Sequence, residues 1–289
     1  MTTWGGTGWA GLPAGRPLVM GILNATPDSF SDGGERLDPG AAIAAGMRMA
    51  EEGADILDIG GESTRPGAAS VDPAEEMRRV LPVIRGLAAQ GCPISIDTRN
   101  AATMRAALDA GAAIVNDVSA LAHDPAAAAV VADAGCPVVL MHMRGTPATM
   151  EAHAQYDDVA ADVTRELADR VAAARAAGIA EAAIALDPGI GFAKTATQNA
   201  ALLAGLPRLA ALGYPLLVGV SRKRVIGAFG HAIAPKDRLP GSLAAGLFAI
   251  ARGARILRVH DVGATVQALR VWAALLDHLP APLWAAAPG

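Results

Sequence analysis

The chain has 289 residues, of which 52% are hydrophobic and 18% charged, and its formal net charge at pH 7 is −4. A chain of this length and apolar content can bury a large core, and many single α/β barrels are as long. The slight acidity, with no basic cluster, argues against nucleic acid as a partner. No apolar run reaches the roughly 20 residues of a membrane helix, and residues 1–18 lack a secretory signal, so we expect a cytoplasmic protein with no membrane partner.

Short apolar runs alternate along the chain with alanine-rich stretches that have helical spacing. The runs predict eight strands, at residues 18–23, 56–60, 94–97, 113–116, 137–142, 183–187, 216–220 and 256–260. Helices are expected at residues 39–52, 73–90, 103–110, 157–177, 240–252 and 262–279. A glycine follows each of the first five helices, as is typical of helix ends: Gly53, Gly91, Gly111, Gly178 and Gly253.

Eight such units predict a single α/β domain, a (β/α)8 TIM barrel with its active site at the C-terminal ends of the strands. An open doubly wound sheet is the alternative, but the glycine signature that such a sheet needs after its first strand is missing. In the barrel scheme residues 1–16 are an N-terminal extension, 17–279 the catalytic barrel and 280–289 a flexible tail. Cys92 and Cys136 precede non-neighbouring strands, so we expect two small buried residues and no disulfide.

Polar side chains follow the predicted strands at one end. Asp97, Asn116 and Asp187 close three strands, and a Ser-Arg-Lys segment ending at Lys223 follows another. A single such aspartate is more often a helix cap than a ligand, but three at strand ends of one barrel favour a site. Because the carboxyl ends of parallel strands meet at one end of the barrel, these groups predict one shared pocket.

The segments at these strand ends resemble those of the dihydropteroate synthase family, and the resemblance extends from Met20 to His260. The matching segments are residues 24–34 (NATPDSFSDGG), 58–67 (DIGGESTRPG), 95–98 (SIDT), 116–117 (ND), 141–143 (MHM), 187–192 (DPGIGF), 221–223 (SRK) and 258–261 (RVHD). The resemblance implies an enzyme of folate biosynthesis that is a target of sulfonamides. Such an enzyme condenses 6-hydroxymethyl-7,8-dihydropterin diphosphate with p-aminobenzoate to give 7,8-dihydropteroate and diphosphate.

The resemblance also implies roles for single residues. Asp187 would accept from the ring N–H and amino group of the pterin, and Asn116 and Asp97 would complete that edge. Lys223 would act as a catalytic residue that donates to the pterin carbonyl and ring nitrogen, between the two substrates. It is one of three lysines among 24 basic residues, which fits a need for a compact ammonium there, although a solvated loop lysine is the plain alternative.

The diphosphate group would lie at the last strand. Arg258 and His260 alternate along it and therefore face the same way, just before a helix whose amino terminus favours anions. By resemblance Arg258, Val259, His260 and Thr64 bind the diphosphate. Asn24 would be a ligand of the cofactor Mg²⁺, together with diphosphate oxygens and waters.

Two loops rich in Gly, Pro and Ser, residues 25–34 and 62–68, are expected to act as lids that exclude water. The resemblance makes Asp32 and Arg65 catalytic lid residues. The p-aminobenzoate wall is expected from Phe30, Pro66 and Phe192, with Arg224 near its carboxylate. A phenylalanine in a barrel is as often a core residue, so the aromatic assignments depend on the resemblance alone.

Three positions depart from the family pattern. Many relatives have Phe where Ile190 stands, Gly where Ala193 stands and Ser where Arg224 stands. The changes at Ile190 and Ala193 predict a reshaped aminobenzoate wall or a stiffer loop, whereas Arg224 can still bind the aminobenzoate carboxylate.

Two other functions stay open. A pterin-binding methyltransferase domain shares the pterin edge but has no use for a diphosphate site. A non-catalytic pterin-binding paralogue would have lost a lid or phosphate residue. The last expected helix, 262–279, carries more apolar residues than one barrel face needs, so we expect a homodimer through the late helices.

Overall fold

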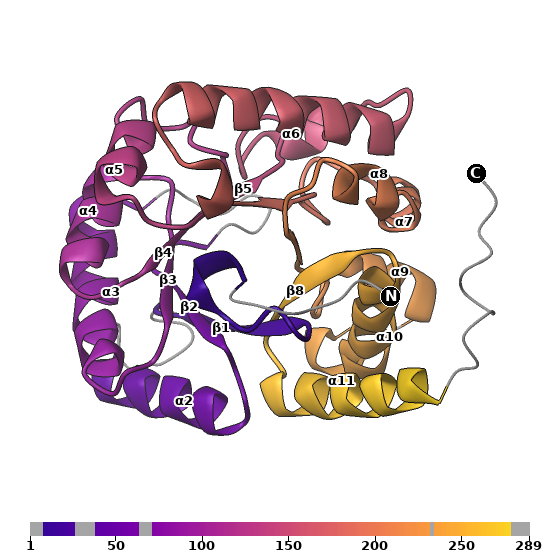
Figure 1. The fold of residues 1–289 in the computed structure, drawn as a ribbon, viewed down its shortest axis with the longest axis horizontal. Helices are drawn as coiled ribbons and strands as arrows, with labels where there is room; N and C mark the ends of the chain where they lie inside the picture. The colour runs from indigo at the N-terminus through magenta and orange to yellow at the C-terminus, as the bar shows by residue number, and fades with distance from the viewer. Residues whose placement is uncertain (1–7, 27–37, 64–70, 232–233, 279–289) are drawn as a thin grey trace.

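The computed structural model describes residues 8–26, 38–63, 71–231 and 234–278, and Figure 1 shows their fold. The eight strands are β1 (Leu18–Asn24), β2 (Ile56–Gly60), β3 (Ile94–Asp97), β4 (Ile114–Asp117), β5 (Val138–Met141), β6 (Ile184–Asp187), β7 (Leu216–Val218) and β8 (Ala254–Val259). Each pairs in parallel with the next, and β8 pairs with β1, so the sheet closes on itself. This closure confirms the predicted (β/α)8 barrel, and the alternative prediction of an open doubly wound sheet is wrong.

Helices form a ring around the barrel (Figure 1). Their bounds are α2 (Pro39–Glu51), α3 (Pro73–Ala88), α4 (Ala101–Asp109), α5 (Ala127–Ala134), α6 (Val159–Ala176), α7 (Ala196–Ala204), α8 (Leu206–Ala210), α9 (Arg224–Gly230), α10 (Leu239–Ala251) and α11 (Val262–Asp277). Short 3-10 turns lie at η1 (Trp9–Gly11), η2 (Met150–His153), η3 (Glu181–Ala183) and η4 (Pro235–Arg238). None of the described helices has the length and apolar character needed to cross a membrane.

Helix starts and ends follow local chemistry. Asp38 and Asp72 each accept a hydrogen bond from a backbone N–H of the helix that they precede, with proline at the first helical position. All five glycines predicted to end helices have positive φ, between 77° at Gly91 and 110° at Gly111. This left-handed conformation is nearly free of strain only for glycine, so these residues separate helix from strand.

The core has two layers, because successive side chains of a strand face opposite sides. Outward residues such as Val19, Leu57 and Ile59 pack against the helices in one large apolar cluster. Inward residues such as Met20 and Ile56 form a smaller cluster inside the barrel. Burying each large side chain contributes about 1.5–3 kcal/mol relative to its exposed state.

The N-terminal segment closes one end of the barrel. Trp9 is buried against the inward cluster, and its indole Nε1 donates to the carbonyl oxygen of Ala183 over 2.8 Å. Ala183 immediately precedes β6, so Trp9 covers the amino ends of the strands. The carboxyl ends, at the opposite side, are the place for a ligand.

Candidate active site

The inward positions change from apolar to polar along the strands. On four strands an inward apolar residue is followed, two positions later on the same face, by a polar one. The apolar residues are Ile56, Ile114, Ala185 and Ile256, and the polar residues are Asp58, Asn116, Asp187 and Arg258. Asp97 has the same place on β3, after Ser95, and is level with Gly60 of β2 and Asn116 of β4. The barrel register therefore collects five polar side chains at the carboxyl end, around one buried space.

Arg258 is at the centre of this group. Its Nε donates to Oδ2 of Asp58 and its Nη2 donates to Oδ2 of Asp97, both over 2.6 Å. Asn116 Nδ2 donates to the same Asp58 oxygen over 3.0 Å, which leaves the amide oxygen of Asn116 as the acceptor for a ligand. One guanidinium thus pairs with two buried carboxyl groups.

Asp58 is a site residue for which no role was predicted from the sequence. It lies within the matched 58–67 segment, but a single aspartate in a strand gave no indication of its partner 200 positions away. Asp58 could have been found from its position two residues after Ile56, which places it inside the barrel. A charge buried there needs an opposite charge beside it.

Burial sets the protonation of these groups. It raises the pKa of Asp97 to about 7, while the Arg258 guanidinium acts in the opposite direction. It also raises the pKa of Asp187, against the charge of Lys223. For Arg258 burial lowers the pKa, but the carboxylates of Asp58 and Asp97 outweigh it and the pKa is raised, so the guanidinium stays charged.

Lys223 lies in the same space, at the start of α9. Its Nζ donates to the carbonyl oxygen of Ile190 and lies 4.7 Å from the centre of the Phe192 ring, a cation–π contact. Burial lowers the pKa of Lys223 to about 8, and the carboxylate of Asp187 opposes this change. Lys223 is half-buried and bonded to the loop after β6 rather than extended into solvent, and the ammonium form prevails at pH 7.

The turn before Lys223 depends on Arg222, which has the left-handed φ of 58°. Three contacts hold it: its N–H donates to Ser242 Oγ over 2.9 Å, its carbonyl oxygen accepts from Arg238 over 2.9 Å, and its Nε donates to Asp261 over 2.9 Å. These bonds fix a backbone conformation that costs a non-glycine residue about 1–2 kcal/mol. They turn Lys223 into the barrel mouth.

The loop after β6 is tightly bent around the site. Asp187 Oδ1 accepts from the N–H of Gly189 over 2.7 Å. Gly189 has a φ of 68°, and a Cβ there would collide with the carbonyl oxygen of His142. Ile190 is buried among core side chains, and its carbonyl oxygen accepts from Lys223. Ala193 takes a left-handed φ of 50°.

The predicted phosphate residues lie beside this space. His260 follows β8, and its Nδ1 is 3.0 Å from Ser221 Oγ. Val259 packs outward into the helix-side core, so only its backbone can reach a ligand. Asn24 is the last residue of β1, level with Gly60.

The remaining predicted residues are Arg224, at the surface, and five residues that lie outside the described part of the chain. Arg224 is exposed and pairs with Glu151 over 2.6 Å, which places it on the surface. Outside the described residues lie Phe30, Asp32, Thr64, Arg65 and Pro66, together with most of both predicted lid loops.

A magnesium site made only of protein groups does not fit this pocket. Among the described residues no group of three or more His, Cys, Asp or Glu side chains could hold a metal ion. Asn24, at the carboxyl end of β1, suits a different arrangement. In it Mg²⁺ would bind one protein oxygen, and its other ligands would be phosphate oxygens of the substrate and water molecules.

A closed parallel barrel with a charged pocket at the carboxyl ends of its strands defines a (β/α)8 protein that acts on small molecules. The family model described as pterin binding enzyme matches residues 20–260. Dihydropteroate synthase of Neisseria meningitidis serogroup C is 49% identical over 263 residues, which cover 90% of this chain and 93% of that one. The chain thus belongs to the pterin-binding enzyme family and, within it, to the dihydropteroate synthases.

Solved structures agree. Dihydropteroate synthase from Xanthomonas albilineans with 4-aminobenzoic acid is 55% identical, with a TM-score of 0.86 over 92% of this chain and 94% of that chain. The same organism's enzyme in complex with 7,8-dihydropteroate is 52% identical, with a TM-score of 0.83 over 92% and 95% of the two chains.

Proposed function

We propose that this protein condenses 6-hydroxymethyl-7,8-dihydropterin diphosphate with p-aminobenzoate, giving 7,8-dihydropteroate and diphosphate in tetrahydrofolate biosynthesis. The observation that carries this is the convergence of three buried residues, Asp97, Asn116 and Asp187, with two half-buried cations, Lys223 and Arg258, at the carboxyl end of one barrel. Family membership supports the same reaction.

The pterin would bind through its polar edge. Asp187 is buried and ionisable, and it suits the ring N–H and amino group as a two-oxygen acceptor. The Asn116 oxygen, oriented by the bond from its Nδ2 to Asp58, suits a further ring donor. Lys223 would donate to the pterin carbonyl and ring nitrogen, so donors and acceptors alternate along the pocket as they do along the ring.

The reaction is a substitution at the pterin methylene. The aniline nitrogen of p-aminobenzoate forms the new C–N bond, the C–O electron pair leaves with diphosphate, and the nitrogen releases its proton. The aniline is neutral at pH 7, so no strong base is required. Arg258 and His260 would stabilise the charge that develops on the leaving diphosphate, while a ring held between Asp187 and Lys223 spreads the positive charge of a dissociative path.

We also propose that Asn24 holds Mg²⁺ together with the diphosphate oxygens and waters. The ion would supply further neutralisation of the leaving group. Thr64 and Arg65 would bind the diphosphate, and Asp32, Arg65, Phe30 and Pro66 would close the site over p-aminobenzoate.

The test is diphosphate release by the purified protein with Mg²⁺ and pterin diphosphate, with and without p-aminobenzoate. Release that needs both substrates and yields dihydropteroate would establish the synthase. Pterin binding without product would indicate the non-catalytic paralogue, and methyl transfer to a pterin would indicate the methyltransferase. Absence of pterin binding would contradict the whole assignment.

We propose further that the protein is a cytoplasmic homodimer. Several large apolar side chains are exposed on α9, α10 and α11, which lie together in Figure 1: Phe229, Phe248, Val271, Leu275 and Leu276. A patch of this kind on neighbouring helices suits an isologous interface. Leu275, 62% exposed, is the best probe: Leu275→Glu should produce monomers in light scattering, and a wild-type monomer would contradict the dimer.

A further inference from the structure

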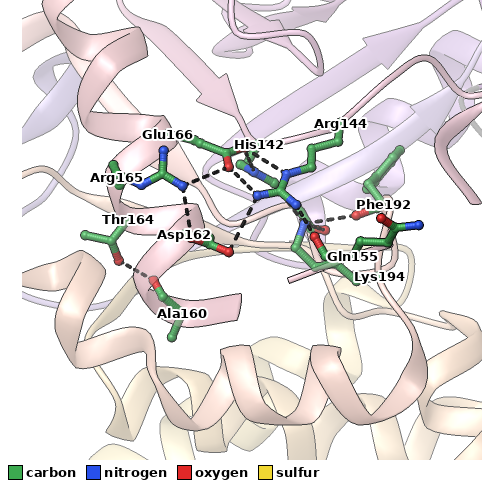
Figure 2. Close-up of polar contacts among 11 residues, drawn as sticks. His142, Arg144, Gln155, Ala160, Asp162, Thr164, Arg165, Glu166, Phe192 and Lys194 are labelled. Carbon is green, nitrogen blue, oxygen red and sulfur yellow. Dashed lines mark hydrogen bonds and ion pairs between the residues drawn. The ribbon is translucent and has the colours of Figure 1, made fainter. Parts of the chain in front are cut away.

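A polar cluster with no role in the proposed chemistry lies beside the pocket, between the end of β5, the loop after β6 and helix α6 (Figure 2). Its members are Lys194, His142, Glu166 and Arg144. The guanidinium carbon of Arg144 also lies 4.0 Å from the centre of the Tyr156 ring. His142 lies within the 141–143 segment that matches the family, but no role was predicted for it.

Lys194 uses all three of its ammonium hydrogens. Its Nζ is 3.1 Å from the carbonyl oxygen of Gly189, 2.9 Å from that of Phe192 and 3.0 Å from Nδ1 of His142. Three donors therefore meet three acceptors. Two of the acceptors belong to the loop after β6, and the third belongs to the neighbouring strand end.

His142 orients this ammonium. Since its Nδ1 accepts from Lys194, its Nε2 carries the proton and donates to Glu166 Oε2 over 2.9 Å. Burial lowers the pKa of His142, which favours this neutral form. The bonds from His142 and then Arg144 lower the pKa of Glu166 to about 2. Glu166 therefore stays a carboxylate that holds the imidazole in one tautomer.

The loop that Lys194 holds is the loop that contacts Lys223. Ile190 supplies the carbonyl oxygen for Lys223 Nζ, and Phe192 supplies the ring under it. Asn199 on α7 fixes the other side of the loop, because its Oδ1 accepts from Gly191 N over 2.7 Å. A shift of this loop would move Lys223 relative to both substrates.

We propose that Lys194 is a positioning residue for the synthase reaction: held by His142, it fixes the loop after β6 and thereby sets the place of Lys223 between the two substrates. This inference rests on the proposed function. Burial lowers the pKa of Lys194 to about 7, with the Asp187 carboxylate acting against the change, so the ammonium form that makes all three bonds is favoured below this pH.

The first test is Lys194→Met, which keeps the length of the side chain and removes its donors. Lys236→Met is the matched control, because Lys236 is exposed on η4. We expect kcat per folded molecule to fall about 30- to 100-fold in Lys194→Met, as for other small misplacements of reacting groups, and to stay within twofold in the control. Pterin diphosphate affinity, measured by titration calorimetry, should fall at least threefold.

A second pair separates positioning from plain stability. In His142→Gln an amide can still accept from Lys194 and donate to Glu166, so at least a third of kcat should remain, whereas His142→Leu should lose activity as Lys194→Met does. Kinetic constants and affinity unchanged in folded Lys194→Met, or equal losses in both His142 variants, would overturn the proposal. If the unmodified protein proves inactive, the proposed synthase function fails, and the calorimetric series alone decides the positioning role.

Discussion

At the scale of single residues, Arg258 governs the buried charge of the site. Replacing it with alanine would leave Asp58 and Asp97 without their cation, and losing one partner of a buried ion pair costs about 3–5 kcal/mol. Arg258→Ala would therefore weaken folding as well as phosphate binding. Changes on the carboxylate side are cleaner probes.

Asp58→Asn should separate charge from shape. The variant keeps an oxygen for Asn116 but removes one carboxylate from Arg258. We expect kcat/KM for pterin diphosphate to fall about 10- to 100-fold, since a hydrogen bond to a charged group contributes about 1.5–3 kcal/mol. The matched control is Asp55→Asn, which breaks the pair of Asp55 with Arg16 at the opposite end of the barrel. Equal kinetics in the two variants would rule out a site role for Asp58.

Lys223 should impose an alkaline limit on activity. Burial lowers its pKa to about 8, against the nearby carboxylate of Asp187, so the ammonium donor exists below this pH and is lost above it. Arg258 stays charged throughout this range, and the pKa of Asp97, about 7, lies below that of Lys223. We expect kcat/KM for the pterin substrate to fall as pH rises through about 8. A profile that stays flat to about pH 10 would contradict this role for Lys223.

The sequence predicted some of these residues but not their partners. Asp97, Asn116, Asp187, Lys223 and Arg258 were found because each ends a recognisable strand or motif. The bonds of Arg258 span 200 residues to Asp58 and 161 residues to Asp97, and no local pattern reports such a pair.

At the scale of elements, the strands and long helices were predictable because each has a strong local signal. Three-residue β7 is the exception: its expected run to residue 220 ends at Val218, where the chain turns toward Arg222. No bounds were predicted for the short helices α5, α7, α8 and α9, since stretches of five to nine residues carry little periodicity. The bend of the loop after β6 depends on Gly189 meeting a neighbouring strand end, which only the fold reveals.

Ala193 gives this loop a measurable strain. Its φ of 50° costs a non-glycine residue about 1–2 kcal/mol, more than the entropy that glycine loses on folding. Ala193→Gly should therefore raise the free energy of unfolding by about 0.5 kcal/mol and the melting temperature by roughly 1–2 °C. Ala10→Gly, at a φ of 58° in η1, is the matched change far from the site. A lower melting temperature for Ala193→Gly would mean that the methyl group's packing outweighs the strain.

At the scale of the whole molecule, the two ends of the barrel have different roles: the amino end contributes to stability and the carboxyl end holds the candidate site. The amino end is apolar and closed by Trp9, while the carboxyl end holds the buried charges. Substitutions at the two ends should therefore change different properties of the protein.

Trp9 provides the test of this division. Trp9→Ala should lower the free energy of unfolding by about 3 kcal/mol, because it empties a buried aromatic site. Trp9→Phe should cost about 1 kcal/mol, mainly the bond to the Ala183 carbonyl. Denaturant unfolding gives both values, and kcat per folded molecule should not change. A fall in kcat in folded Trp9→Phe would show that the two ends are coupled.

The double pairing of Arg258 also bears on product release. In the protein without ligand its guanidinium is already paired with the carboxyl groups of Asp58 and Asp97, each 2.6 Å away. In the proposed reaction a departing diphosphate would therefore leave behind a guanidinium that is already paired. Asp58 and Asp97 would compete with the product anion for Arg258 and so favour the release of diphosphate.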